Sequence, residues 1–108
     1  YDGNYLNGKR DGNWLFYRPD GSIQKNINYH NGNKEGIALT WYLNGNKEIE
    51  ESYKEGLLHG NFISYRLDGT KKYEASFVNG IMQGKAIWWG VNGQKYIESD
   101  FKEGVINY

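Results

Sequence analysis

The stretch YKEGLLHGNFISYRLDGTK, residues 53–71, decides the fold because close copies of it recur along the chain. The copies begin at Tyr5, Tyr29 and Phe77, and the opening of a further copy begins at Phe101, always 24 residues apart. Repeats of this length indicate an array in which each unit packs on its neighbours. We therefore expect one domain, 1–108, made of repeats 5–28, 29–52, 53–76 and 77–100 and a partial repeat 101–108.

Glycine recurs at three places in each repeat, as at Gly32, Gly36 and Gly45. Neither a helix nor an uninterrupted strand would keep glycine so often. The sequence RPDG, residues 18–21, instead fits a type I turn followed by a glycine in the left-handed region, which is a three-residue hairpin with a bulge. Short apolar runs lie on both sides of each turn. The repeats therefore predict an all-β protein, a continuous antiparallel meander of hairpins.

The positions that keep their character in every copy predict two faces. Odd positions such as Leu15, Tyr17 and Tyr29 are aliphatic or aromatic in all copies, whereas even positions such as Glu50 and Ser52 are polar. Side chains alternate between the two faces of a strand. We therefore expect the odd positions to form an apolar face and the even positions to form a wet face.

Charge and composition exclude several classes of partner. Lys plus Arg and Asp plus Glu both number 13, so the formal net charge is zero. This balance argues against a nucleic-acid partner and makes membrane lipid an unlikely ligand. Cysteine is absent, which excludes disulfides and thiolate chemistry. The mean hydropathy of −0.85 argues against a transmembrane segment.

Residues that carry catalysis or bind metals do not converge in the sequence. His30 and His59 fall in connecting loops at different places of the repeat. Glu50, Glu74 and Glu98 recur one repeat apart, about 10 Å on an open sheet, which is too far for paired acid–base work. No phosphate-binding glycine motif is present, and the turns account for the glycines. We expect no catalytic site, no metal site and no cofactor.

The repeat resembles the MORN repeat, and in particular its bacterial variant. The pattern is an aromatic residue, two glycines, a second aromatic residue and an Asn/Asp-Gly pair, as in Tyr29, Gly32, Gly36, Trp41, Asn44 and Gly45. This resemblance implies an elongated, twisted, single-layer β-meander. Bacterial members of the family are often antitoxin components or surface-borne repeats, and eukaryotic members tether membranes or scaffold other proteins.

Two functions follow from the resemblance. The first is a non-catalytic protein–protein interaction module, such as an antitoxin or immunity protein that binds a toxin. The alternative is an architectural or surface-displayed array that acts as a spacer, an adhesion element or a membrane-proximal scaffold. Since the chain begins at Tyr1 without methionine, we expect it to be processed or excised from a longer one. The sequence leaves its compartment open between the bacterial cytoplasm and, if an upstream signal was removed, the cell surface or periplasm. A sheet edge or the apolar face offers a route to homo-oligomers.

A set of aromatic residues breaks the repetition and supplies the candidate site. We expect four aromatic residues to anchor a partner: Trp14, Phe16, Phe62 and Trp88. We expect three glutamates to lie beside them on the even face: Glu50, Glu74 and Glu98. Exposed rings among polar groups are typical of recognition surfaces. The alternatives are that these rings pack as cross-strand pairs or are covered by a segment outside the chain.

Overall fold

The structure, a computed structural model, describes residues 1–106; the last two residues of the expected partial repeat 101–108 lie outside the described part. The strands are β1 (Asp2–Leu6), β2 (Lys9–Tyr17), β3 (Ile23–His30), β4 (Asn33–Lys34), β5 (Gly36–Trp41), β6 (Lys47–Lys54), β7 (Leu57–Tyr65), β8 (Lys71–Val78), β9 (Ile81–Trp89), β10 (Lys95–Lys102) and β11 (Val105–Ile106).

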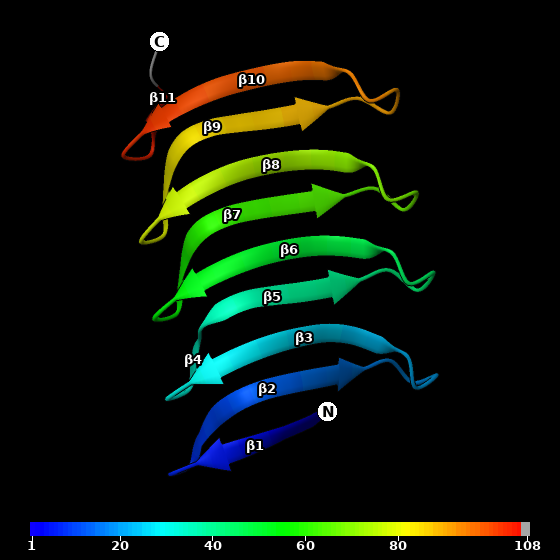
Figure 1. The fold of residues 1–108 in the computed structure, drawn as a ribbon, viewed down its shortest axis with the longest axis vertical. Coiled ribbons are helices and arrows are strands. Elements are labelled where there is room, and N and C mark those ends of the chain that lie inside the picture. The colour runs from blue at the N-terminus through cyan, green and yellow to red at the C-terminus, as the bar shows by residue number, and fades with distance from the viewer. Residues whose placement is uncertain (107–108) are drawn as a thin grey trace.

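All strands join one open antiparallel sheet in which sequence neighbours are spatial neighbours (Figure 1). Glu35 interrupts one strand, so that β4 and β5 both pair with β3. The molecule extends 47 × 33 × 13 Å along its principal axes, and the shortest of these extents is the thickness of a single layer. The predicted all-β, single-layer antiparallel meander is therefore confirmed. No helix of the described residues is long and apolar enough to cross a membrane.

The three-residue turns along one edge follow the predicted geometry. In the first, Gly21 has φ 89° and donates its backbone N–H to the Arg18 carbonyl at 2.9 Å. The Asp20 carboxylate accepts hydrogen bonds from the backbone N–H of Ser22 at 2.9 Å and from its hydroxyl at 2.6 Å. Asn44, Asp68 and Asn92 accept the equivalent backbone bond in the other repeats. The Asn/Asp-Gly pair therefore closes each turn through both of its residues.

The opposite edge has two-residue turns that the sequence analysis left undescribed. Their first residue has φ between 50° and 53° and the following glycine has φ between 77° and 83°, which defines a type I′ turn. Asparagine tolerates this left-handed conformation, but Glu55 and Glu103 occupy it in two of the five turns. In three cases the N–H of that first residue donates to a side chain of the preceding repeat: Glu55 to Glu35, Asn79 to His59 and Glu103 to Gln83.

The expected division of odd and even positions between two faces is wrong across the turns. Trp14 lies opposite Ile27, and Leu15 lies opposite Asn26, so even residues of β2 share a face with odd residues of β3. The same exchange occurs in every repeat. Its cause is the turns, because a two-residue hairpin pairs residue i with i+3, and a bulge after each three-residue turn shifts the return strand by one.

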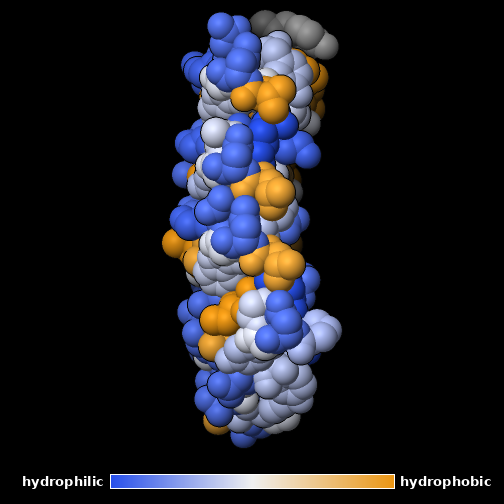
Figure 2. All heavy atoms as spheres, turned by 90° about the vertical axis from the view of Figure 1, so that its right-hand side faces the viewer, coloured by the Kyte–Doolittle hydropathy of each residue, from blue (hydrophilic) through white to orange (hydrophobic). Residues whose placement is uncertain are grey.

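The core of this single layer is thin. The hydrophobic residues that are buried among residues 1–106 are Trp14, Ile27, Ala38, Ile63, Ala75 and Ala86. The tips of three turns, by contrast, carry exposed Leu43, Leu67 and Val91. Figure 2 views this edge and shows hydrophobic patches that recur along it between hydrophilic ones.

The left-handed turn position supplies a stability prediction. Glu55→Asn should raise the free energy of unfolding by about 0.5–1 kcal/mol, because asparagine avoids most of the cost that other side chains meet at this φ. The reciprocal change Asn31→Glu, at the same position of another turn, should lower it by a similar amount. Urea denaturation measures both. Shifts of the same sign in the two variants would contradict the explanation.

The carboxylates of the three-residue turns predict a pH dependence. Hydrogen bonds, first from the Ser22 or Thr70 hydroxyl and then from the backbone N–H, lower the pKa of Asp20 and Asp68 below the ordinary value. The stability that these bonds give is present above the ordinary pKa and is lost as pH falls through the lowered one. The double variant Asp20→Asn, Asp68→Asn, which copies the other two turns, should therefore lose less stability than wild type between about pH 5 and pH 2. Equal losses, measured as urea midpoints, would refute this prediction.

Candidate interaction face

Strand register assigns each predicted site residue to one of two faces. We call the first the aromatic face, which carries the columns Trp14/Ala38/Phe62/Ala86, Phe16/Thr40/Ser64/Trp88, Lys25/Ile49/Tyr73/Ile97, Ile27/Glu51/Ala75/Ser99 and Tyr29/Tyr53/Phe77/Phe101. We call the second the Lys–Glu face, which carries Leu15/Leu39/Ile63/Ile87, Tyr17/Trp41/Tyr65/Trp89 and Asn26/Glu50/Glu74/Glu98. The four predicted anchors share the aromatic face.

The glutamates lie on the opposite face, so the expectation that they surround the aromatic anchors is wrong. Glu50 pairs with Lys47 at 2.9 Å, Glu74 with Lys71 at 3.3 Å, and Glu98 with Lys85 at 3.2 Å. The register shift after each turn is the reason, because it moves these even positions away from the even positions of the preceding strand. Ion pairs exposed to this degree contribute about 0–1 kcal/mol each.

Trp14 is a core residue and not an exposed anchor, because none of its surface is accessible. The ring of Tyr1 stacks on it at 4.9 Å between centroids, and Tyr5 meets it edge-on at 5.0 Å. Its Nε1–H donates to the Asn4 carbonyl at 3.0 Å. A Cβ atom on Gly3 would lie 2.3 Å from the indole, so only glycine leaves room for the ring. Here the alternative expectation, packing between strands, describes the residue.

The C-terminal half of the aromatic face holds a second cluster that remains half-exposed. The ring centroids of Tyr73 and Trp88 lie 4.5 Å apart. The ring centroid of Phe62 lies 6.0 Å from that of Tyr73 and 6.4 Å from that of Phe77. Ala75, directly opposite Phe62 on the neighbouring strand, is completely buried. Small residues thus let the rings lie over neighbouring strands while part of each ring still meets solvent. The sequence analysis missed Tyr73 because its column was not compared between repeats.

Side-chain hydrogen bonds join successive repeats along the three-residue-turn edge. One guanidinium nitrogen of Arg18, Nη2, donates to the Trp41 carbonyl, and the Tyr42 hydroxyl donates to the Tyr65 carbonyl at 2.7 Å. Arg66 donates to the Trp89 carbonyl at 2.6 Å. The sequence analysis missed these links, although Arg, Tyr and Arg stand at one repeat position and are all long donors. These residues stabilise the array and leave both faces open.

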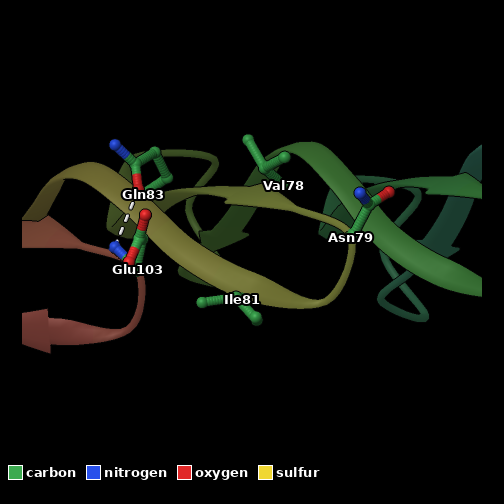
Figure 3. Close-up of a pocket in the computed structure, with 5 residues that line it drawn as sticks. All are labelled: Val78, Asn79, Ile81, Gln83 and Glu103. Carbon is green, nitrogen blue, oxygen red and sulfur yellow. Dashed lines mark hydrogen bonds between the residues drawn. The ribbon is translucent and has the colours of Figure 1, made fainter.

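The described residues offer no group of three or more His, Cys, Asp or Glu side chains that is arranged to hold a metal ion. His30 faces the Asp11 carboxylate at 3.9 Å in an exposed position. A shallow hollow at the two-residue-turn edge is lined by Val78, Asn79, Ile81, Gln83 and Glu103 (Figure 3). Glu103 supplies its one carboxylate, and Asn79 and Gln83 supply two amides. The amide oxygen of Gln83 accepts the backbone N–H of Glu103 at 2.8 Å (Figure 3). This arrangement supplies no acid–base pair.

The burial of Trp14 generates a prediction. Trp14→Ala should lower the free energy of unfolding by about 3–5 kcal/mol, as for other large-to-small changes of buried rings. Trp88→Ala, on the same face but half-exposed, should cost less than about 2 kcal/mol. Urea denaturation gives both values, and amide hydrogen exchange in β1, β2 and β3 shows whether the first repeat opens alone. Equal costs would contradict the assignment of Trp14 to the core.

Comparison with known proteins agrees with the architecture. The family model described as the MORN repeat variant matches residues 10–31 and 34–55. No curated protein shows significant similarity to the chain. MORN repeats are generally non-enzymatic modules that interact with proteins or membranes. The chain therefore carries repeats that match the MORN repeat variant at residues 10–31 and 34–55, and the period of 24 residues continues the same pattern through the rest of the single-layer hairpin meander.

Proposed function

We propose that the chain is a non-catalytic protein–protein interaction module that binds its partner through the aromatic face. One observation carries the proposal: the named columns of the Lys–Glu face keep their chemistry from repeat to repeat, whereas on the aromatic face only the column Tyr29/Tyr53/Phe77/Phe101 does so among the named columns. The columns Leu15/Leu39/Ile63/Ile87 and Tyr17/Trp41/Tyr65/Trp89 keep their chemistry in all four repeats. On the aromatic face, Trp, Ala, Phe and Ala share one column, and Phe, Thr, Ser and Trp share the next.

Architecture accounts for columns that are constant, since every hairpin needs the same turns and the same contacts with its neighbours. Packing explains only part of the variation between repeats, because a large ring in one strand needs a small residue opposite it, as Phe62 lies opposite Ala75. The remaining rings, Phe16, Phe62, Tyr73 and Trp88, are half-exposed and lie on one surface. Aromatic residues are enriched among the anchors of protein interfaces. A face within a sheet of 47 × 33 Å has room for an interface of about 800 Å² per partner.

An antitoxin or immunity protein is the specific role that we propose within this class, with a bacterial toxin as the partner. The repeat pattern supports it through its resemblance to the bacterial variant, whose members often have that role. A single layer with two broad faces suits inhibition by coverage, in which one broad surface blocks another. The formal net charge of zero supports a protein partner over nucleic acid or membrane lipid.

The alternative is an architectural or surface-displayed array, and the exposed turn tips support it. Leu43, Leu67 and Val91 recur at equal spacing along one edge, where they suit lateral contact with other copies or with a surface (Figure 2). The two functions differ in what they require of the aromatic face. A spacer needs it only for stability, whereas a binding module needs its rings for recognition.

Trp88 and Trp89 provide a matched test because they are adjacent, identical and half-buried on opposite faces. Affinity capture from the source organism, with wild type and the variants Trp88→Ser and Trp89→Ser as baits, identifies a candidate partner. Isothermal titration then measures its affinity. We expect Trp88→Ser to cost about 2 kcal/mol of binding, or about 30-fold in Kd, and Trp89→Ser to cost little. Equal losses in both variants, or no partner that depends on Trp88, would refute binding through the aromatic face.

A further inference from the structure

Positive charge gathers in the N-terminal half of the aromatic face, although the whole chain is neutral. The column at the two-residue-turn side of this face reads Arg10, Lys34, Leu58 and Met82, so that its first two members are cationic and its last two are apolar. Lys25, in another column of the same face, lies directly opposite Phe16. The aromatic face thus changes along the array from cationic to apolar.

Aromatic rings hold two of these cations. The guanidinium carbon of Arg10 lies 4.6 Å from the Trp14 ring, 5.4 Å from Tyr29 and 5.7 Å from Phe16. Its Nη1–H donates to the Tyr29 hydroxyl at 3.1 Å. The Lys34 ammonium lies 5.0 Å from the ring of Tyr53. Rings on several sides limit the rotamers of Arg10. The N–H groups that do not bond to Tyr29 therefore keep a nearly fixed orientation for binding a ligand.

The cations on the two faces have different neighbours. On the Lys–Glu face, Lys47, Lys71, Lys85 and Lys95 each lie within 3.9 Å of a glutamate oxygen. Among residues 1–106, none of the ion pairs includes Arg10, Lys25 or Lys34. Glu51 is the acidic member of the aromatic-face columns in this region, and it accepts the Tyr53 hydroxyl at 2.6 Å. The N-terminal half of the aromatic face therefore carries positive charge without carboxylate partners.

We propose that Arg10, Lys25 and Lys34, with the rings of Phe16, Tyr29 and Tyr53, bind a protein segment that carries carboxylates beside apolar side chains. The proposal rests on the proposed function and names the chemistry of the partner. A carboxylate fits the guanidinium fork of Arg10, and apolar side chains fit the rings and the adjacent Leu58 and Met82. Three cations on a neutral chain are too few for the repeated phosphate contacts that retain a nucleic acid at physiological salt.

Three synthetic peptides of about ten residues test the proposal. Each contains two phenylalanines, with serine and glycine as spacers. The first also contains four glutamates, the second four glutamines and the third four lysines. Backbone amide shifts during titration of the isotope-labelled full chain locate binding and give its Kd. We expect the glutamate peptide to shift residues of β2, β3, β4 and β6 and to bind at least about tenfold more tightly than the glutamine peptide, with no binding of the lysine peptide. The preference should weaken at high salt.

Two double variants separate local contact from overall charge. Arg10→Gln with Lys34→Gln removes two cations from the aromatic face, and Lys47→Gln with Lys71→Gln removes two from the Lys–Glu face, so both change the net charge equally. The first pair should weaken binding of the glutamate peptide about tenfold or more, and the second less than about twofold. Equal effects would show that only net charge acts, and would overturn the site.

Other outcomes separate this inference from the proposed function. If the glutamate and glutamine peptides bind the aromatic face equally, the preference for an acidic partner is wrong while protein binding by that face stands. Shifts confined to the Lys–Glu face, or no binding of the glutamate peptide, would overturn the inference. The same holds if a twelve-nucleotide oligothymidylate or phosphatidylserine vesicles bind through Arg10 and Lys34 and the glutamate peptide does not.

Discussion

The two-residue type I′ turn is the constraint on which the rest of the structure depends. It places two successive residues in the left-handed region and pairs the residues on either side of them, as His30 pairs with Asn33. That pairing fixes the register of the next strand, and register decides which side chains share a face. Because the period of 24 residues is even, each repeat then presents equivalent positions on the same side of the sheet. Faces that run the whole length of the array follow from this local geometry.

A single layer must cover both of its faces without help from a second layer. The aromatic face does so with rings that lie across neighbouring strands above small residues such as Ala75 and Ala86. The Lys–Glu face uses an aliphatic column beside a column of Tyr and Trp. Long donors such as Arg66 then join successive repeats along one edge. These contacts are local in sequence, so the array needs no long-range closure, and each added repeat stabilises its neighbour.

Periodicity was sufficient to predict the fold, because the spacing of glycines, aromatic residues and Asn/Asp-Gly pairs reports turns and strands directly. It was insufficient to predict the faces. Alternation is a rule within one strand. A second bulge, at Gln24 between Ile23 and Lys25, exchanges odd and even positions, and the turn sequence predicts only the glycine bulge before it. The burial of Trp14 was also beyond the repeat pattern, since it depends on Tyr1 and Gly3, which precede the first repeat. The sequence predicts that Glu50, Glu74 and Glu98 form one column, but the face on which this column lies depends on the bulges.

The net charge of the whole chain does not describe the charge of either face, and the reason is geometrical. A sum over the chain treats Lys71, which has a glutamate 3.3 Å away, as equal to Arg10, which has rings instead. In a compact domain such differences average over a closed surface, but a single layer of 13 Å keeps two surfaces apart over its whole length. On one face glutamates neutralise the lysines, while on the other Arg10 and Lys34 lie over aromatic rings. A partner that docks on a flat face meets the charge of that face first, since solvent and salt screen the more distant charges. For a sheet of this kind, recognition has to be argued face by face from the strand register.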